Sequence, residues 1–313
     1  MSIALRVLAI LCAGLFSLPL PAGATLRIAT YNLDNYLLMD RRVNNRWRPS
    51  YPKPEREKLV IRQNILQHDP DILALQEMGP KEFLEELRAD LASEGLHYSY
   101  MVHLDGPDPD RHLALLSKIA PRCVEKHTDL DFKYLDRRER VKRGMLEVTF
   151  DSGNGDLFKV FVVHLKSRYT EDKKDPDSQL RRVREAEACR NRIIERTHDR
   201  GQNRYMIMGD FNDHPNSSTM RRFYHRGDLR IGDLLPASDS RGDVWTYFYA
   251  RQSQYSLIDG FVVSSALKPD VKSGSARIVD TPGTMIGSDH RMLYLDLSCL
   301  AAVQAAGSEV EER

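Results

Sequence analysis

The sequence predicts a mixed α/β domain with a large antiparallel component. Short apolar runs recur along the chain, outnumber the helical segments, and in several places follow one another with no helical stretch between them. A regular βαβ repeat would instead place a crossover helix after each strand. Of the 313 residues, 41% are hydrophobic and 29% are charged, as is typical of globular proteins, and no Gly/Ser-rich or Pro-rich linker divides the chain. We therefore expect one folded domain over residues 25–300, followed by a disordered tail over residues 301–313.

The first 24 residues have the pattern of a secretory signal peptide. Arg6 precedes an apolar run over residues 7–20, and Pro21 and small residues ending in Ala24 follow it. A positive start, a short apolar stretch and an A-x-A ending are the parts of such a leader, so we expect cleavage after Ala24 and an exported protein. The alternative is an N-terminal membrane anchor, for which the run is short and interrupted by proline.

The apolar runs define the expected strands, and two periodic segments define the expected helices. In chain order the runs cover residues 26–33, 71–78, 113–119, 144–150, 157–165, 204–211, 256–263 and 291–297. Residues 53–68 and 178–197 instead carry apolar side chains at helical spacing.

Charge and cysteine content exclude several classes of protein. The chain has 46 Lys and Arg against 45 Asp and Glu, a formal net charge of +1. It therefore has no overall basic field that would draw it to nucleic acid, and any polyanion site has to be local. Beyond the leader, Cys123, Cys189 and Cys299 are widely spaced, which excludes a small disulfide framework or a zinc knuckle. The sequence is compatible with one disulfide bond and one free thiol among these three cysteines.

Nearly every expected strand ends in, or contains near its end, a polar residue. These residues are Asn32, Glu77, His164, Asp210 with Asn212, Asp259, and Asp289 with His290. Each alone has an ordinary explanation as a turn residue, a cap or a hydrogen-bonded core histidine. Buried carboxylates are costly without a partner, however, and one bound cation would compensate several of them. The set therefore predicts one shared site where the strand ends meet.

The stretch IMGDFND, residues 207–213, is the densest part of this set. Side chains two apart on an extended chain share a face, so Asp210 and Asn212 are expected to project together while Phe211 enters the core. Asp213 is expected to cap the following helix or to form an Asx turn.

Taken together, the motifs resemble the endonuclease/exonuclease/phosphatase superfamily, which includes pancreatic-type deoxyribonuclease, abasic-site endonucleases, neutral sphingomyelinases and inositol polyphosphate 5-phosphatases. The matching stretches are TYNL, LALQE, VVHLKS, MGDFND, LIDGFVVS and SDHRML, in the family's order over residues 26–297. The resemblance implies the deoxyribonuclease I-like fold, a four-layer sandwich of two packed mixed β-sheets flanked by helices. It also implies metal-assisted hydrolysis of a phosphoester by an in-line water molecule.

The resemblance further implies a metal site. Glu77 is expected to be the principal ligand of Mg²⁺, with Mn²⁺ as a possible substitute, because hard oxygen ligands suit both ions. Asn32 and Asp289 are expected to lie beside the same metal ion. The metal's function there would be to polarise the phosphoryl group and to neutralise developing charge.

For the chemical step, the resemblance implies Asp210 as the base that orients water, with Asn212 holding the phosphate or that water. His290 and Asp259 are expected to form a pair in which the carboxylate fixes the imidazole tautomer. His164 occupies the place of a histidine near the leaving group, as in deoxyribonuclease-type members. Which histidine acts as the acid is left open.

Three basic residues are candidate phosphate ligands. Lys166 and Arg168 follow His164 at spacings of two and four, so they would share its face if the strand continued. Arg111 is a third candidate. A solvated strand edge explains each of them equally well.

Nucleic acid is the expected substrate, DNA first and RNA second. RRVNNRWR, residues 41–48, interleaves four arginines with Trp47 and contains no acid, which favours a nucleic-acid contact. DRRERVKR, residues 136–143, contains acids of its own and is interpreted as a solvated surface. The alternatives are a sphingomyelinase-like phospholipid phosphodiesterase, for which we find no compact aromatic loop, and an inositol-phosphate phosphatase.

A non-enzymatic binding module of the same fold is the remaining alternative. Such a module would be expected to lack at least one of Glu77, Asp210 and His290, and all three are present. A calcineurin-like metallophosphoesterase is disfavoured. GDFND fits the G-D-x-x-D part of its pattern, but the D-x-H match at residues 110–112 lies in a proline-rich stretch, and no G-N-H-[D/E] or later paired histidines follow.

Overall fold

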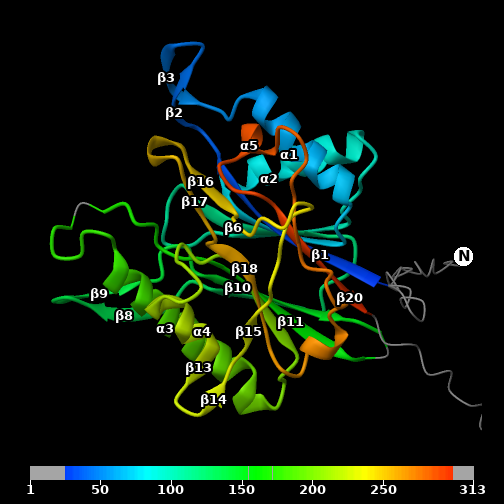
Figure 1. Cartoon of the computed structure of the whole chain (residues 1–313), viewed down its shortest axis with the longest axis vertical. Helices are drawn as coiled ribbons and strands as arrows, with labels where there is room; N and C mark the ends of the chain where they lie inside the picture. Colours follow the sequence, from blue (N-terminus) through cyan, green and yellow to red (C-terminus); the bar gives the residue numbers. More distant parts are fainter. Residues whose placement is uncertain (1–24, 154, 171, 299–313) are drawn as a thin grey trace, which may run out of the picture.

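Two six-stranded mixed sheets form the centre of the computed structural model, which describes residues 25–298 except 154 and 171 (Figure 1). The first sheet consists, in spatial order, of β19 (Arg277–Ile278), β20 (Leu293–Ser298), β1 (Thr25–Tyr36), β4 (Ile72–Met78), β6 (His112–Ser117) and β5 (Tyr100–Leu104). The second consists of β15 (Asp233–Leu234), β18 (Asp259–Val263), β12 (Tyr205–Asp210), β11 (Leu157–His164), β10 (Met145–Asp151) and β7 (Cys123–His127). Each sheet has one parallel pair, β1 with β4 and β11 with β12, and its other pairs are antiparallel.

Helices cover the outer face of each sheet, which gives the molecule four layers. Apolar side chains of α1 (Glu55–His68) and α2 (Lys81–Ser93) share a buried cluster with the outer face of the first sheet. Those of α3 (Gln179–Arg196) and α4 (Ser218–Tyr224) do the same on the second sheet, and α5 (Thr284–Gly287) lies against α1. The predicted four-layer sandwich is therefore confirmed.

Strand β1 shows why the strands read as continuous apolar runs. Leu26 and Ile28 point into the core between the sheets, whereas Ala29 and Tyr31 face the helical layer, and all four are buried. A strand that is covered on both faces needs apolar side chains at successive positions instead of an alternating pattern.

All the predicted strands and both predicted helices are present, but several elements were not predicted. Helix α2 follows Pro80. Four hairpins lie outside the two sheets: β2 (Met39–Val43) with β3 (Arg46–Tyr51), β8 (Asp131–Tyr134) with β9 (Arg137–Arg140), β13 (His225–Arg226) with β14 (Leu229–Arg230), and β16 (Tyr247–Tyr249) with β17 (Gln254–Ser256). Short 3₁₀ turns are η1 (His198–Arg200), η2 (Ala250–Gln252) and η3 (Lys268–Asp270). These elements are short or mainly polar, so no long apolar run signals them.

The chain ends predicted to be a signal peptide and a tail lie outside the described residues, as does Cys299. Cys123 and Cys189 are free thiols, the first exposed and the second buried. Within the described residues, we find no helix with the length and apolar character needed to span a membrane.

Candidate active site

Three of the predicted site residues lie in a row across adjacent strands of the second sheet. In the register of the sheet, Asp210 at the end of β12 pairs with His164 on β11 and with Asp259 on β18. The neighbouring Gly209 has φ 134°, and a Cβ atom there would lie 2.0 Å from the carbonyl oxygen of Val163. Only glycine allows this approach, so the glycine of IMGDFND sets the position of the carboxylate that follows it.

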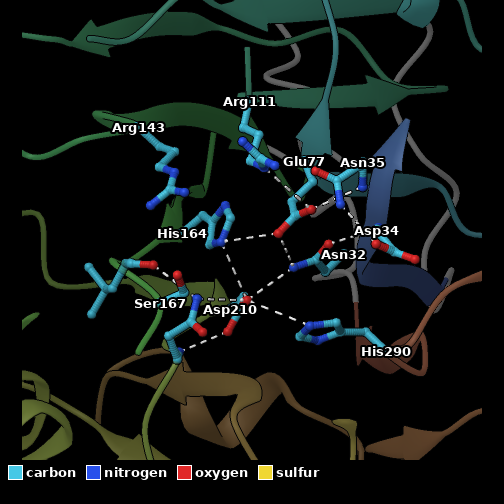
Figure 2. A network of polar contacts seen from close by, with 12 residues as sticks. Asn32, Asp34, Asn35, Glu77, Arg111, Arg143, His164, Ser167, Asp210 and His290 are labelled. Atoms are coloured by element: carbon cyan, nitrogen blue, oxygen red, sulfur yellow. Dashed lines mark hydrogen bonds and ion pairs between the residues drawn. The ribbon is translucent and has the colours of Figure 1, made fainter. Parts of the chain in front are cut away.

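Asp210 is the hub of the site (Figure 2). Its Oδ2 accepts hydrogen bonds from Nδ2 of Asn32 and Nδ2 of Asn212, each at 3.0 Å. Its Oδ1 accepts one from the backbone N–H of Asn212 at 2.8 Å. Asp210 and Asn212 therefore converge as predicted, but for a different reason: the strand ends at Asp210, and Asn212 turns back with φ 53°. Phe211 is buried, as expected.

His290 and Asp259 form the expected pair. Nδ1 of His290 lies 2.9 Å from Oδ2 of Asp259, and its Nε2 faces Oδ2 of Asp210 at 3.9 Å. Burial opposes the charged imidazole, but the charges of Asp259 and Asp210 outweigh it and raise the pKa of His290 well above its ordinary value. Ser288 fixes the segment, because its hydroxyl donates to the backbone carbonyl of Asn32 and accepts from the backbone N–H of His290.

His164 lies on the opposite side of Asp210 and experiences the opposite electrostatic environment. Its Nε2 is 3.5 Å from Oδ2 of Asp210 and 3.7 Å from Oε1 of Glu77. Burial, and then the positive charge of Arg143, lower the pKa of His164 well below its ordinary value. Its Nδ1 is buried without a hydrogen-bond partner among the described residues. The site thus contains one imidazole that favours the charged form and one that favours the neutral form.

Glu77 comes from the first sheet, in an unusual backbone conformation. It has φ 58°, in the left-handed region that side chains other than glycine rarely adopt, and Asp34 and Asn35 share that region. The backbone N–H of Asn35 donates to Oε2 of Glu77 at 2.9 Å, and Nε of Arg111 lies 3.8 Å from the same oxygen. Backbone strain of this kind is concentrated at functional sites, where the surrounding structure maintains it.

The residues around Glu77 suit a hard divalent cation. Burial together with the charges of Asp34 and Glu77 raises the pKa of Asp289 to about 7, so the carboxylates here repel one another. Asn32 lies beside them, with its Nδ2 donating to Oε1 of Glu77 at 3.5 Å and its Oδ1 accepting from the backbone N–H of Asp34. Carboxylate and amide oxygens are the preferred ligands of Mg²⁺ and Mn²⁺, and a bound cation would remove the repulsion. Asp210, Asp259 and His290 form a second group whose ligand atoms lie within 4.8 Å of one another.

The three candidate phosphate ligands are placed differently from one another. Arg111 lies at the site beside Glu77. The ammonium of Lys166 instead donates to the backbone carbonyls of Ser167 and Tyr169. The guanidinium of Arg168 contacts Nε2 of His214 at 2.8 Å. The premise that Lys166 and Arg168 share the face of His164 is wrong, because β11 ends at His164 and a loop follows.

The interpretation of Asp213 as a helix cap is also wrong. Ser217 caps α4 with its hydroxyl. Asp213 is buried, accepts a hydrogen bond from Thr219 at 2.7 Å, and pairs with Nε of Arg182 on α3 at 3.2 Å. It therefore joins the end of β12 to the helical layer.

A cavity of about 530 Å³ adjoins the site at Asn212. The β16–β17 hairpin lines one side of it, and the ring of Tyr247 lies 4.8 Å from that of His290. Phe248 and Tyr255 stack across this hairpin, so it is aromatic, and the sequence did not predict it. Its tip, residues 250–254, is polar apart from Ala250.

Sequence reasoning missed several residues that support the site. They are Asp34, Asn35, Arg143, Tyr247 and Ser288. Asp34, Asn35 and Ser288 each lie within three positions of a predicted residue, so the motifs contained a usable signal. Tyr247 reaches the site only through the tertiary fold, and the sequence around it gives no such signal. Arg143 corrects the interpretation of residues 136–143 as a solvated surface, because its side chain is buried, pairs with Asp108 and lies beside His164.

The profile of the Endonuclease/Exonuclease/phosphatase family matches residues 29–290 of this chain. Among solved structures, the chain resembles an endonuclease/exonuclease/phosphatase from Bacteroides vulgatus with 17% identity and a TM-score of 0.61, over 88% of this chain and 98% of that one. It resembles the human nocturnin catalytic domain, determined with a bound sulfate anion, with 17% identity and a TM-score of 0.62 over 89% and 95%. Sphingomyelinase C from Streptomyces griseocarneus is similar with 15% identity and a TM-score of 0.57 over 88% and 99%. No curated protein sequence matches significantly.

Proposed function

Because the chain belongs to the endonuclease/exonuclease/phosphatase family of metal-dependent phosphoester hydrolases, we propose that it is an exported nuclease that cleaves phosphodiester bonds, with DNA as its main substrate and RNA as a possible second one. In this proposal Glu77, Asn32 and Asp289 hold Mg²⁺ or Mn²⁺, which supplies positive charge to the phosphoryl oxygens when bound. The remaining side chains bind the substrate, orient the attacking water and exchange protons with them.

Asp210 is proposed to orient the attacking water and to accept its proton. Burial and the nearby charge of Asp259 raise the pKa of Asp210 above its ordinary value, which makes it a better base near neutral pH. The amides of Asn32 and Asn212 fix the carboxylate in place. His290, kept positively charged by Asp259, stabilises the phosphoryl group, and His164 turns its Nε2 toward Asp210 and Glu77 beside the reacting centre.

The observation that favours nucleic acid is the β2–β3 hairpin, which projects from the body of the molecule (Figure 1). Arg42, Arg46 and Arg48 are exposed there and make no ion pair or side-chain hydrogen bond with any described residue. Arg48 stands directly opposite Arg41, although like charges across a strand pair are destabilising. Trp47 is 66% exposed and has no ring contact within the described residues. Unpaired guanidinium groups around a free aromatic face suit a phosphate backbone with stacked bases.

The hairpin is attached directly to the candidate metal site. The guanidinium of Arg41 donates to the backbone carbonyls of Asn35 and Leu37, and Asn35 in turn donates to Glu77. A polyanionic strand bound along the hairpin would therefore lead to the reacting centre. A small phosphoester would not need these arginines.

A phospholipid substrate is the second candidate, favoured by the exposed Tyr255 of the β16–β17 hairpin. Membrane insertion requires a continuous apolar surface, however. The tip of that hairpin is polar, and Trp47 stands among arginines, asparagines and a serine on the other hairpin. Both hairpins therefore suit a charged, aromatic polymer better than a lipid surface.

The test is an assay of chain 25–313 with Mg²⁺, and separately with EDTA, on supercoiled plasmid, RNA, sphingomyelin vesicles and bis-p-nitrophenyl phosphate. We expect plasmid nicking that EDTA abolishes. In R42A/R46A/R48A, plasmid binding should weaken, and the slope of log K against log salt should fall by about 2–3, since each lost phosphate contact contributes about 0.9. Turnover of bis-p-nitrophenyl phosphate should not change.

The matched control is R137A/R138A/R140A, which removes three arginines from the β9 strand of another hairpin. It should leave the salt slope of plasmid binding unchanged. Hydrolysis of sphingomyelin alone would reject the nuclease proposal. An equal loss of plasmid binding in the two triple variants would reject the role of the β2–β3 hairpin.

Export is proposed from the leader pattern of residues 1–24. Expression of the full chain in a bacterial host, followed by N-terminal sequencing of the protein outside the cytoplasm, should give a mature chain that begins at Thr25. A full-length chain that stays with the membrane fraction would support the anchor alternative.

A further inference from the structure

Two histidines and an aspartate outside the catalytic residues converge at one end of the first sheet. His103 on β5 pairs in register with Ala114 on β6, and His112 lies two residues before Ala114, so the two imidazoles share a face of the sheet. Their ring centroids are 4.9 Å apart. The carboxylate of Asp105, just after β5, completes the group, and one ligand atom from each residue lies within 4.8 Å of the others.

The spacing of the three atoms matches that of metal ligands. Nδ1 of His103 is 3.2 Å from Oδ1 of Asp105, and Nδ1 of His112 is 3.7 Å from the same oxygen. Two ligands that each lie about 2.0–2.1 Å from a tetrahedral ion are roughly 3.3 Å apart. The group therefore needs little movement to surround an ion.

The imidazole of His103 is fixed in an orientation that suits a ligand. Its Nε2 lies 2.9 Å from the backbone carbonyl oxygen of Gly79, which can only accept a hydrogen bond. Nε2 must therefore carry the proton, which leaves the lone pair of a neutral ring on Nδ1, the atom that faces Asp105. A backbone carbonyl that orients a histidine in this way is the usual support behind a metal-bound imidazole.

His112 provides the second, independent observation. Its side chain is buried, and its Nδ1 has no hydrogen-bond partner among the described residues. Buried polar atoms are nearly always hydrogen-bonded, so an unpartnered nitrogen aimed at a carboxylate and a second imidazole calls for an explanation. A shared cation provides one.

We propose that His103, Asp105 and His112 bind a first-row transition-metal ion, with Zn²⁺ as the best match. Two imidazoles and one carboxylate suit Zn²⁺ and similar ions, whereas Mg²⁺ prefers oxygen ligands only. Asp105 is 77% exposed, so water reaches the fourth position. The site is separate from the catalytic metal site in both its residues and its ligand chemistry.

Such an ion would hold the loop between β5 and β6 in place. Asp105 lies at the start of that loop and His112 at its end, and a metal would link both to His103. Arg111, the residue before His112, lies against Glu77. The ion would thus fix the segment that presents Arg111, and its expected role is structural.

The test measures Zn²⁺ binding by titration calorimetry and locates the ion by anomalous diffraction of crystals soaked with Zn²⁺. We expect an anomalous peak between His103, Asp105 and His112, in addition to any peak at Asp210 and His290. D105A should weaken this one binding event at least tenfold, because it removes a ligand whose side chain is exposed and not needed for folding. H112Q, which removes the unpartnered nitrogen, should have the same effect.

The matched control is D110A, which removes an exposed carboxylate from the same loop that is not one of the three groups. It should bind Zn²⁺ as the wild-type chain does. Zn²⁺ should also raise the Tm by a few degrees in the wild type and D110A, and by less in D105A. A peak only at the catalytic residues, or equal binding by D105A and D110A, would overturn the proposal.

Discussion

At the scale of single residues, the site is organised by the opposed environments of its two histidines. Asp259 and Asp210 raise the pKa of His290, whereas burial and Arg143 lower the pKa of His164. Titratable groups whose environments separate their pKa values are typical of sites in which a charged and a neutral group act together. Asp210 lies between the two rings, with its Oδ2 3.5 Å from Nε2 of His164 and 3.9 Å from Nε2 of His290.

The first prediction concerns His290. In H290N the amide nitrogen can take the place of Nδ1 and keep the bond to Asp259, while the group that faces Asp210 is lost. We expect kcat on bis-p-nitrophenyl phosphate to fall about 10²- to 10⁴-fold, the usual contribution of a positioned acid–base or charged side chain. The Tm should change little, because the buried carboxylate of Asp259 retains a donor.

H290A is the comparison for this variant. It loses the same activity but also leaves Asp259 without its donor, which should destabilise the fold by about 1–3 kcal/mol. A retained kcat in H290N would show that His290 is not part of the chemical step. Equal Tm values for the two variants would contradict the pairing with Asp259.

The sequence motifs pointed to the candidate site residues, but to only some of the residues that support them. Glu77 and Asp210 follow apolar runs and His290 precedes one, and their residue types are unusual at strand ends. Tyr247 lies against His290 only because a hairpin folds over the site, so nothing in its local sequence indicates the contact. Local sequence patterns indicate local structure. Contacts between residues that lie far apart in the sequence become visible only in the three-dimensional structure.

At the scale of elements, the end of β12 determines the shape of the site. Gly209 lets β12 approach β11, and the turn at Asn212 folds the amide back onto Asp210. Asp213 then anchors this turn to α3 through Arg182. The sequence correctly predicted that Asp210 and Asn212 converge, but it could not distinguish an extended strand from a turn that gives the same result.

The second prediction concerns this anchor. In D213A the guanidinium of Arg182 stays buried and keeps only carbonyl partners, the backbone oxygens of Lys166 and Asp177. Removing one partner of a buried ion pair typically costs about 3–5 kcal/mol. We expect a loss of this size in the free energy of unfolding, measured by urea titration followed by circular dichroism.

The control for the anchor is E85A, which breaks the exposed ion pair between Lys81 and Glu85 on α2. Exposed pairs contribute about 0–1 kcal/mol, so this variant should unfold close to the wild-type midpoint. A similar small effect in D213A would mean that the Arg182–Asp213 pair does not hold the turn.

At the scale of the whole molecule, the site exists because two sheets face each other across one core. Glu77 and Asn32 come from the first sheet, and His164, Asp210 and Asp259 come from the second. Eight strands of the two sheets were predicted because covered strands require apolar runs, whereas the four strands at the sheet edges, β5, β7, β15 and β19, were not. Sheet order and the position of the hairpins were not, since spatial neighbours in a mixed sheet are set by packing and not by any local pattern.

The last prediction concerns a buried charge cluster that joins the second sheet to α3. Glu147 on β10 accepts hydrogen bonds from Lys159 on β11 and from Arg196 on α3, and it pairs with His127 on β7. Burial alone would raise the pKa of Glu147, but the bonds from His127 and Lys159 outweigh it and lower the pKa from 4.5 to about 2. A carboxyl with a depressed folded-state pKa stabilises the fold above its unfolded-state pKa, and this contribution is lost as the pH falls through the folded value.

We therefore expect the free energy of unfolding to decline between about pH 4.5 and pH 2, by no more than roughly 3 kcal/mol from this group. Because other carboxyls titrate in the same range, the quantity to measure is the difference between the wild type and E147Q, obtained by urea unfolding at several pH values. Glutamine keeps the shape of the side chain but cannot ionise. The wild-type advantage should be largest above pH 4.5 and should shrink towards pH 2, whereas a difference that stays constant over this range would show that the charge of Glu147 does not stabilise the junction of sheet and helix.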